Sequence, residues 1–441
     1  MITAKAFAGK KYAVYGLARS GLATAAALLA SGAYVTAWDA NEEQRAKAPA
    51  GTEIASLDEA DLSQFDSLVV TPGLPLNRHP IASRAREAGV EIIGDIELFA
   101  RARPELPPHK VVGITGTNGK STTTALVHHI LKTAGVPTEM GGNIGLPILA
   151  QDPLPQGGVY VLELSSYQID LTQSLDCDVA VLLNITPDHL DRYDAFETYR
   201  DSKMRLFEMQ SPAHVAIFTR EDQSGYDAYR DRWQDAHDTT LLVTSTGTSD
   251  DRLNSGLEEW TGQRRWPALQ GPHNLQNALC AAAACWTLGD QSFDDLKRGL
   301  ETYPGLPHRL ERIREKSGVT FVNDSKATNP TATAPALAAF DRIRWICGGQ
   351  PKTDNLAECA PQFGHVRKAY TIGEAGELFA SLLSPYMAVA ECETLERAVG
   401  EAAAEAEAGD TVLLSPACAS FDQFRDFEDR GDQFRKLVEE L

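Results

Sequence analysis

An apolar run from Val111 to Ile114 leads directly into segment 115–122, which reads Thr-Gly-Thr-Asn-Gly-Lys-Ser-Thr. After it, apolar residues recur with helical spacing over 125–131. A strand, a glycine loop and a helix in this order are typical of a parallel α/β sheet. The backbone N–H groups of such a loop and the helix N-terminus bind phosphate oxygens. The pattern predicts a nucleoside triphosphate site in which Lys120 contacts the terminal phosphates and Ser121 or Thr122 holds Mg²⁺.

The loop departs from the strict phosphate-binding pattern, which has a glycine five positions before the Gly-Lys pair. Ile114 occupies that position, Gly113 lies one residue too early, and Gly116 stands three residues before Gly119. A chance match therefore stays open on the loop alone. The flanking strand and helix favour a true phosphate loop.

The size and charge of the chain narrow the classes of protein. Its 441 residues suggest about three domains. With 41 basic and 61 acidic residues the net charge is −20, which argues against non-specific binding to nucleic acid or to an anionic membrane. No apolar run reaches the ~18 residues that span a bilayer, and no secretory segment follows Met1. The seven cysteines form no C-x-x-C pair. We expect a cytoplasmic protein with reduced thiols, no nucleic-acid partner and no membrane insertion.

The N-terminal third alternates strands and helices. Strands are expected at 12–15, 34–38 and 67–70, with a helix from 19 to 30 after the loop Gly16–Gly21. In such a βαβ arrangement, ligands bind beyond the carboxyl ends of the strands. Ala18 occupies the second glycine position of the dinucleotide pattern, which opposes a full NAD site. A smaller nucleotide, its diphosphate or a mere tight turn remain open.

The rest of the chain divides at two proline-rich segments. The segment 101–108 is expected to be a linker and 303–307 a hinge, so the predicted domains are 1–103, 104–304 and 305–441. Further strands are expected at 159–163, 179–183, 320–322, 344–346, 369–372 and 411–414, and an alanine-rich helix up to 288. The polar stretch 220–265 is left unassigned. The predicted fold class is three consecutive α/β domains: Rossmann-like, P-loop and Rossmann-like.

Three residues of the middle domain are candidates for metal chemistry. Glu163 ends a buried strand, where a carboxylate can hold Mg²⁺ opposite the loop hydroxyl, although a helix N-cap explains it too. His189 follows another strand and is either a metal ligand or a hydrogen-bonded loop residue. Lys203 is either part of the site or a plain surface lysine.

Polar loops follow the strands of the third domain. They lie at 323–329, 348–352 and 415–420, and three such loops at strand ends predict a ligand cleft in which Lys352 binds a carboxylate. Helix capping is the alternative for Asp324 and Ser325. Arg309 follows the hinge and is either a phosphate contact or part of a surface ion pair.

Taken together, these segments resemble the Mur ligases of peptidoglycan synthesis over essentially the whole chain. That family uses the shortened loop G-T-x-G-K-[ST], which accounts for Ile114. Asp324–Asn329 and Ser415–Phe424 are similar to the members that add D-glutamate, and the D-N-P-R motif of the diaminopimelate-adding members is absent. The resemblance implies that ATP phosphorylates the carboxylate of UDP-N-acetylmuramoyl-L-alanine. The amine of D-glutamate then attacks the acyl phosphate, and ADP and phosphate leave.

The resemblance also implies a role for each matching residue. The ATP site comprises Gly116, Thr117, Asn118, Gly119, Lys120, Ser121, Thr122, Asn274, Asn277, Arg309 and Asp324. Two Mg²⁺ sites use Ser121, Glu163, His189 and Lys203, with Lys203 carbamylated by CO₂. The UDP substrate contacts Arg19, Ser20, Asp39, Gly73, Asn143, Ser165 and His189. D-Glutamate contacts Thr328, Lys352, Ser420 and Phe427. Lys120, His189, Lys203 and Lys326 take part in catalysis, and the protein is expected to be a monomer.

Two departures and three rivals accompany this interpretation. Ala40-Asn41 stands where some relatives carry Thr-Arg, and Gln350-Pro351 stands where Asp-Gly is common. These differences put one uracil contact and the presentation of Lys352 in doubt. The nearest rival is a sister amide ligase, such as folylpolyglutamate synthase or the L-alanine-adding enzyme. A nucleotide-dependent switch would not need the third-domain cleft, and an NAD-dependent dehydrogenase is opposed by Ala18.

Overall fold

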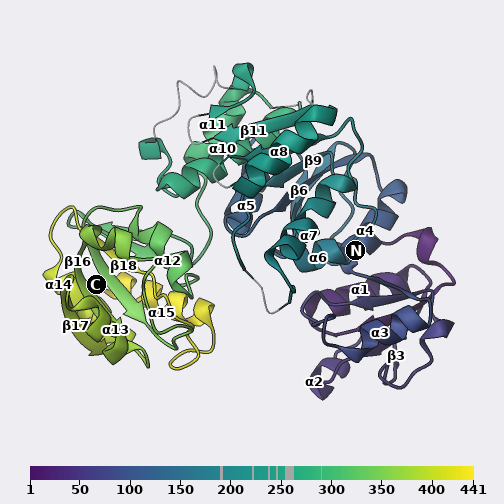
Figure 1. Cartoon of the computed structure of the whole chain (residues 1–441), viewed down its shortest axis with the longest axis horizontal. Coiled ribbons are helices and arrows are strands. Elements are labelled where there is room, and N and C mark those ends of the chain that lie inside the picture. Colours follow the sequence, from purple (N-terminus) through teal and green to yellow (C-terminus); the bar gives the residue numbers. More distant parts are fainter. Residues whose placement is uncertain (189–191, 221–222, 237–238, 245–246, 254–262, 290) are drawn as a thin grey trace. The chain divides into compact units, whose positions relative to one another are not determined.

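The computed structural model describes residues 1–441 apart from 189–191, 221–222, 237–238, 245–246, 254–262 and 290. The chain packs as two compact units (Figure 1). Unit 1 comprises Met1–Trp260 and Gln276–Leu300, and unit 2 comprises Thr261–Leu275 and Glu301–Leu441. Unit 1 holds two sheets and unit 2 holds one.

The first sheet of unit 1 is parallel throughout, in the order β3-β2-β1-β4-β5. Its strands are β1 Lys11–Tyr15, β2 Tyr34–Trp38, β3 Glu53–Ile54, β4 Ser67–Val70 and β5 Glu91–Ile93. Its helices are α1 Arg19–Ala30, α2 Glu42–Arg45, α3 Pro80–Glu87 and α4 Asp95–Ala102. The strand order reverses at β1, so the carboxyl end of β1 is the place where such sheets bind ligands.

The second sheet of unit 1 has the order β12-β11-β10-β9-β6-β8-β7 and is parallel except for β12. Its strands are β6 His109–Thr115, β7 Thr138–Gly142, β8 Gly158–Glu163, β9 Val179–Leu182, β10 Val215–Thr219, β11 Thr240–Thr244 and β12 Gly247–Thr248. The helices are α5 Lys120–Thr133, α6 Ser166–Asp170, α7 Phe196–Glu208, α8 Gln223–Ala236, α10 Pro272–Thr287 and α11 Phe293–Thr302. The phosphate loop thus joins a central strand, β6, to α5.

The sheet of unit 2 has the order β13-β14-β18-β15-β16-β17, with only β13 antiparallel to its neighbour. Its strands are β13 Glu311–Lys316, β14 Val319–Asn323, β15 Ile343–Gly348, β16 Val366–Ile372, β17 Ala388–Glu393 and β18 Thr411–Leu414. The helices are α12 Pro330–Leu337, α13 Gly376–Leu383, α14 Leu395–Glu405 and α15 Phe427–Glu440. Because β14, β18 and β15 are adjacent and parallel, the loops that follow them meet at one sheet edge.

Short 3₁₀ helices complete the described part of the chain. They are η1 Lys5–Phe7, η2 Leu62–Gln64, η3 Arg103–Glu105, η4 Ile148–Ala150, η6 Gln263–Arg265 and η7 Ala360–His365. Within the described residues, no helix is both long and apolar enough to cross a membrane.

The predicted fold class is confirmed, because each predicted domain range contains one α/β sheet. The domain boundaries themselves stay a prediction. The expected linker at 101–108 is partly wrong. Arg101 belongs to α4, where its guanidinium pairs with Glu91 at 2.6 Å and Glu97 at 2.8 Å, and η3 follows directly. Local ion pairs therefore order a segment whose composition is that of a loop.

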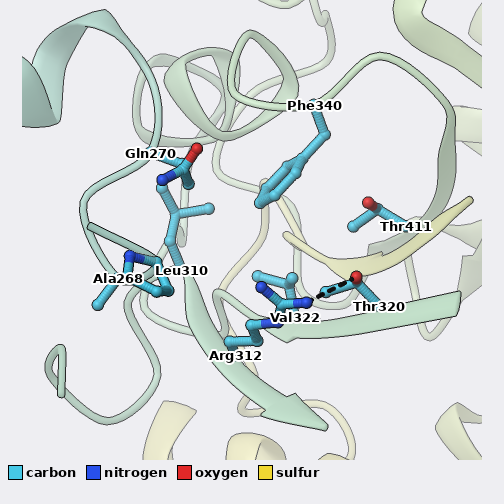
Figure 2. A pocket seen from close by; sticks show the side chains of 9 residues that line it. Ala268, Gln270, Leu310, Arg312, Thr320, Val322, Phe340 and Thr411 are labelled. Atoms are coloured by element: carbon cyan, nitrogen blue, oxygen red, sulfur yellow. Dashed lines mark hydrogen bonds between the residues drawn. The ribbon is translucent and has the colours of Figure 1, made fainter. Parts of the chain in front are cut away.

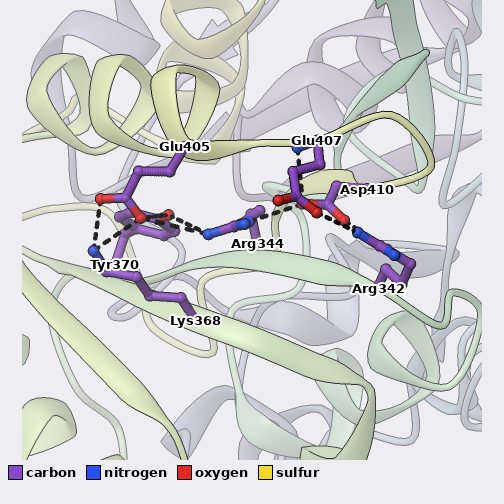
Figure 3. Close-up of polar contacts among 7 residues, drawn as sticks. All are labelled: Arg342, Arg344, Lys368, Tyr370, Glu405, Glu407 and Asp410. Carbon is purple, nitrogen blue, oxygen red and sulfur yellow. Dashed lines mark hydrogen bonds and ion pairs between the residues drawn. The ribbon is translucent and has the colours of Figure 1, made fainter.

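A charged network at the amino edge of the unit 2 sheet is shown in Figure 3. The buried carboxylate of Asp410 accepts from Arg342 Nε at 2.7 Å and Arg344 Nε at 3.0 Å. Glu405 accepts from Lys368 Nζ at 2.7 Å and from the Tyr370 hydroxyl at 2.9 Å. These charges pair with one another at the sheet end opposite the polar loops. We therefore assign the network to stability.

Candidate active site

The phosphate loop is held by the segment that follows β9. The backbone N–H of Thr117 donates to Asn184 O at 2.8 Å, and that of Asn118 donates to Asn184 Oδ1 at 2.8 Å. Gly119 has φ +85° and precedes α5, and a Cβ there would collide with Asn277 Oδ1. Only glycine fits this position, and its conformation places the N-terminus of α5 at the end of β6.

Two lysine amines meet at this loop. Lys120 Nζ donates to Gly116 O at 2.9 Å and Thr117 O at 2.8 Å. Lys203 Nζ, from α7, donates to the same Gly116 O at 2.9 Å. Lys203 is only 1% exposed, so the surface-lysine alternative is wrong. Burial and then the charge of Lys120 lower the pKa of Lys203 well below its usual range, which favours a neutral, nucleophilic amine.

A buried carboxylate faces the same region from β8. Glu163 is 2% exposed and accepts from Asn143 Nδ2 at 2.9 Å through Oε1, whereas its buried Oε2 has no hydrogen-bond partner among the described residues. Ser165, not Glu163, caps α6, through a reciprocal pair with Gln168. The N-cap alternative for Glu163 is therefore wrong. A buried carboxylate oxygen without a protein hydrogen-bond donor is favourable only when a ligand or cation pairs with it.

The donor set fits a hard divalent cation. Mg²⁺ prefers a few carboxylate and hydroxyl oxygens and keeps several waters or phosphates. Glu163 Oε2 and the buried Ser121 hydroxyl supply such atoms. The described residues contain no group of three His, Cys, Asp or Glu side chains placed as a metal site. His189, another predicted ligand, lies outside the described residues.

Three of the predicted UDP-substrate residues, Arg19, Ser20 and Asp39, lie just beyond the carboxyl ends of β1 and β2. Asp39 Oδ2 accepts from the Leu17 N–H at 2.7 Å, and Asp39 Oδ1 from the Asn41 N–H at 2.8 Å. Arg19 and Ser20 begin α1, and the Arg19 guanidinium donates to Gly145 O at 2.7 Å. Helix α1 therefore presents its N-terminus where a diphosphate would bind.

Sequence reasoning missed two arginines beside these residues. Arg192 donates to Gly73 O at 3.2 Å and Leu74 O at 2.8 Å. Arg45 donates to Asp39 O at 2.7 Å, and its guanidinium carbon lies 4.5 Å from the centre of the Trp38 ring. Neither arginine belongs to a motif. Only the tertiary structure identifies them.

In unit 2, Asp324 lies at the end of β14 among polar partners. The Ser415 hydroxyl donates to Oδ2 at 2.8 Å and the Leu310 N–H to Oδ1 at 3.1 Å. Burial raises the pKa of the Asp324 carboxyl to about 7, although these hydrogen bonds oppose the shift. Asn329 caps α12, which excludes capping as the role of Asp324.

The residues predicted to bind D-glutamate converge at the same sheet edge. Lys352 Nζ donates to Thr328 Oγ1 at 3.3 Å. Gln350 and Ala419 pair through reciprocal backbone hydrogen bonds of 2.9 Å, which join the Lys352 loop to the loop that carries the buried Ser420. This arrangement presents hydroxyl and ammonium groups together, as a carboxylate ligand requires.

Aromatic and guanidinium groups hold these loops from α15. Lys326 Nζ lies 3.8 Å from the centre of the Phe427 ring. Arg430 is wholly buried and donates to Ser325 Oγ and O, both at 2.9 Å, to Cys418 O at 3.1 Å and to Ala419 O at 3.2 Å. No sequence signal indicated the role of Arg430, because this residue lies among charged and polar residues that are typical of an exposed helix. Its contacts make it a positioning residue for two site loops.

A pocket of about 340 Å³ lies within unit 2 (Figure 2). Leu310 lines it and also donates to Asp324. The walls include Val322, the ring of Phe340 and the amide-bearing Gln270. Gln270 O accepts from Asn274 Nδ2 at 3.0 Å, so one predicted adenine contact abuts this pocket. Asn277, the other, lies beside Gly119 in unit 1.

The loop, the buried lysine and the three sheets define an α/β protein built to bind nucleotide phosphates. Family models match most of the chain: the Mur ligase MurD-like N-terminal domain at 10–94, the Mur ligase middle domain at 114–285, and the Mur ligase glutamate ligase domain at 308–418. The chain belongs to the Mur ligase family. The predicted family is thus confirmed.

Full-length relatives share one printed description, UDP-N-acetylmuramoylalanine--D-glutamate ligase. The relative from Novosphingobium aromaticivorans is 59% identical over all of this chain and 97% of its own length. The one from Sphingopyxis alaskensis is 57% identical, with both chains fully covered. Among solved structures, MurF ligase from Thermotoga maritima in complex with ADP has a TM-score of 0.59 and 17% identity, covering 99% of this chain and 97% of that one. This last likeness concerns the fold alone.

Proposed function

We propose that this chain is an ADP-forming ligase that joins D-glutamate to UDP-N-acetylmuramoyl-L-alanine through an acyl phosphate. The observation that carries the proposal is the 59% identity, over the whole chain, to a relative with that printed name. The reaction belongs to peptidoglycan precursor synthesis and so serves cell wall biogenesis, cell shape and division. We place it in the cytoplasm and infer a monomer, which light scattering can test.

The first half of the reaction moves the terminal phosphoryl group of ATP to the substrate carboxylate. The N-terminus of α5 and the Lys120 ammonium stabilise the negative charge on the transferring group. Mg²⁺ would be held by Ser121, Glu163 and His189, with a carbamylated Lys203, and would neutralise phosphate charge. The orphaned Glu163 Oε2 supports this assignment. Arg309 supplies a further phosphate contact.

The carbamate proposal rests on the burial of Lys203. A neutral amine attacks CO₂ through its lone pair, the new N–C bond forms, and an N–H proton passes to solvent. The product is an anionic carbamate. Burial lowers the pKa of Lys203 well below its usual range, which favours the neutral amine. The position of Nζ, which shares Gly116 O with Lys120, would place the new anion beside the phosphate loop.

The second half of the reaction uses the unit 2 loops. Lys352 and Thr328 bind a carboxylate of D-glutamate, with Ser420 and Phe427 completing the site. We place Lys326, whose Nζ lies over the Phe427 ring, near the incoming substrate. The amine of D-glutamate attacks the acyl carbon, a tetrahedral intermediate forms, and phosphate leaves as the amide bond closes. We further propose that the pocket in Figure 2 receives the adenine ring, with Asp324 on the ribose.

Each of the three predicted domains then binds one substrate: 1–103 binds the UDP substrate, 104–304 binds ATP, and 305–441 binds the amino acid. Arg19, Ser20, Asp39, Gly73, Asn143 and Ser165 are the proposed UDP-substrate contacts. The hydrogen bond from Asn143 to Glu163 supports a substrate path that ends beside the proposed metal.

One assay tests the proposal. The protein is incubated with ATP, Mg²⁺, UDP-N-acetylmuramoyl-L-alanine and single amino acids, and ADP and the new amide are measured. We expect both products only with D-glutamate. ADP release at the same rate with and without an amino acid would refute the ligase assignment. An amide formed with another amino acid would indicate a sister ligase.

A further inference from the structure

We propose that a groove between α7 and α8 is a binding site for a small organic cation with an apolar body. The groove measures about 560 Å³ and is lined by residues of both helices and of the connection between them. This volume lies within the ~300–1,000 Å³ range of small-molecule sites. None of the residues proposed for the ligase reaction lines it.

The floor of the groove is apolar. Met204 and the buried Phe207 come from α7, and Ala228 comes from α8. A ligand here would remove hydrocarbon surface from water, which favours binding by ~25 cal/mol per Å² of apolar area. The floor therefore requires an apolar part of the ligand.

The rim of the groove is negatively charged. It carries four carboxylates, those of Asp201, Glu208, Asp227 and Asp231. Two guanidinium groups oppose them: Arg200 pairs with Asp201 at 2.7 Å, and Arg230 lies 3.4 Å from Asp227 and 3.2 Å from Asp231. These exposed pairs are weak, and two negative charges remain in excess. The rim therefore favours a cationic ligand.

Gln210 supplies an independent observation at the floor. It lines the groove and is 7% exposed, and its Nε2 donates to Cys177 O at 2.9 Å and Val215 O at 3.1 Å. Within the part of the chain that the structure describes, its buried Oε1 has no hydrogen-bond partner. With Nε2 committed to the two carbonyls, the amide offers only an acceptor, and a buried acceptor calls for a donor. An ammonium group in the groove would pair with the rim, and one that reaches Gln210 Oε1 would also satisfy the amide.

Methionine-methyl NMR tests this site directly. The chain has five methionines, of which Met204 lies in the groove. In full-length protein labelled at the methionine methyl groups with ¹³C, we expect 4-phenylbutylamine to shift the Met204 resonance, identified with Met204→Leu. The resonances of Met1, Met140 and Met387 should stay in place. The uncharged 4-phenylbutanol, of similar shape, should bind at least fivefold more weakly.

Matched charge variants separate this site from general attraction to an acidic protein. Asp227→Asn with Asp231→Asn should weaken amine binding at least fivefold without changing the melting temperature by more than a few degrees. Glu377→Gln with Glu396→Gln removes the same charge from exposed positions on α13 and α14 and should change affinity less than twofold. An unmoved Met204 resonance, equal binding of the alcohol, or equal effects of the two double variants would overturn the proposal. Tenfold tighter binding of a ten-residue lysine-containing amphipathic peptide would also overturn it, in favour of a protein partner.

Discussion

Replacing Arg430 by methionine should weaken D-glutamate binding far more than it weakens the fold. The guanidinium makes four hydrogen bonds to Ser325, Cys418 and Ala419. Bonds to a charged group contribute about 1.5 kcal/mol each at the lower end, so their loss costs about 6 kcal/mol. These bonds fix the two loops that carry Lys326, Thr328 and Ser420.

The buried charge offsets most of that loss. Burial lowers the pKa of Arg430 to about 10 from 12.5. At 1.36 kcal/mol per pKa unit, burial disfavours the charged form of Arg430 by about 3 kcal/mol. Methionine carries no charge and so removes this cost, and the apolar side chain of methionine adds some packing. We therefore expect a net destabilisation of about 2–3 kcal/mol in urea unfolding. The protein should remain folded at 25 °C.

Steady-state kinetics give the functional readout. The KM for D-glutamate should rise at least tenfold in Arg430→Met and less in Arg430→Lys, which keeps the charge but not the fork. The KM for ATP should change less than twofold. Arg314→Met is the matched control, because Arg314 also donates to carbonyls of α15, Val438 O and Glu439 O, both at 3.1 Å, away from the site loops. An unchanged KM for D-glutamate in folded Arg430→Met would refute the positioning role.

Three further predictions concern other buried charges. Lys203→Ala should lose at least a hundredfold in ligase activity and recover part of it with added acetate or propionate; no recovery would contradict the carbamate. Because burial raises the pKa of Asp324 from 3.8 to about 7, its deprotonation costs folding energy. The free energy of unfolding of the wild type should therefore fall relative to that of Asp324→Asn as pH rises from about 4 to about 7. The slope should be at most ~1.4 kcal/mol per pH unit. Parallel curves of unfolding free energy against pH for the two proteins would argue against this burial. Asp410→Asn should lower the free energy of unfolding by roughly 2 kcal/mol through its pairs with Arg342 and Arg344, with activity per folded molecule unchanged; equal unfolding midpoints would show that the pairs contribute little.

The fold was largely predictable because its signals are local. Buried parallel strands are short apolar runs, and each glycine loop or polar turn marks where one ends. The phosphate loop at 115–122 shows this plainly, since strand, loop and helix are contiguous. The prediction of a linker at 101–108 was partly wrong because ion pairs with Glu91 and Glu97 order Arg101. Glu97 lies one helical turn from Arg101, whereas Glu91 lies on another element.

The candidate site was predictable where a motif carries it. Lys120, Asp324 and Lys352 each follow a strand, so the parallel sheet brings the loops of one unit to one edge. Arg45, Arg192 and Arg430 carry no local signal. Their roles arise from hydrogen bonds to backbone carbonyls on other elements, and nothing in their sequence neighbours specifies those contacts.

The sequence by itself determined the three α/β domains, the phosphate loop and the family, because these depend on residues close together along the chain. The tertiary structure decided which ionisable groups are buried. From the sequence, Lys203 is either a site residue or a surface lysine, and Glu163 is either a metal ligand or a helix N-cap. Packing removes water from both side chains. Burial lowers the pKa of the amine, and among the described residues one carboxylate oxygen has no hydrogen-bond partner. A change of solvation is a property of the assembled fold, because it depends on every element that surrounds the group.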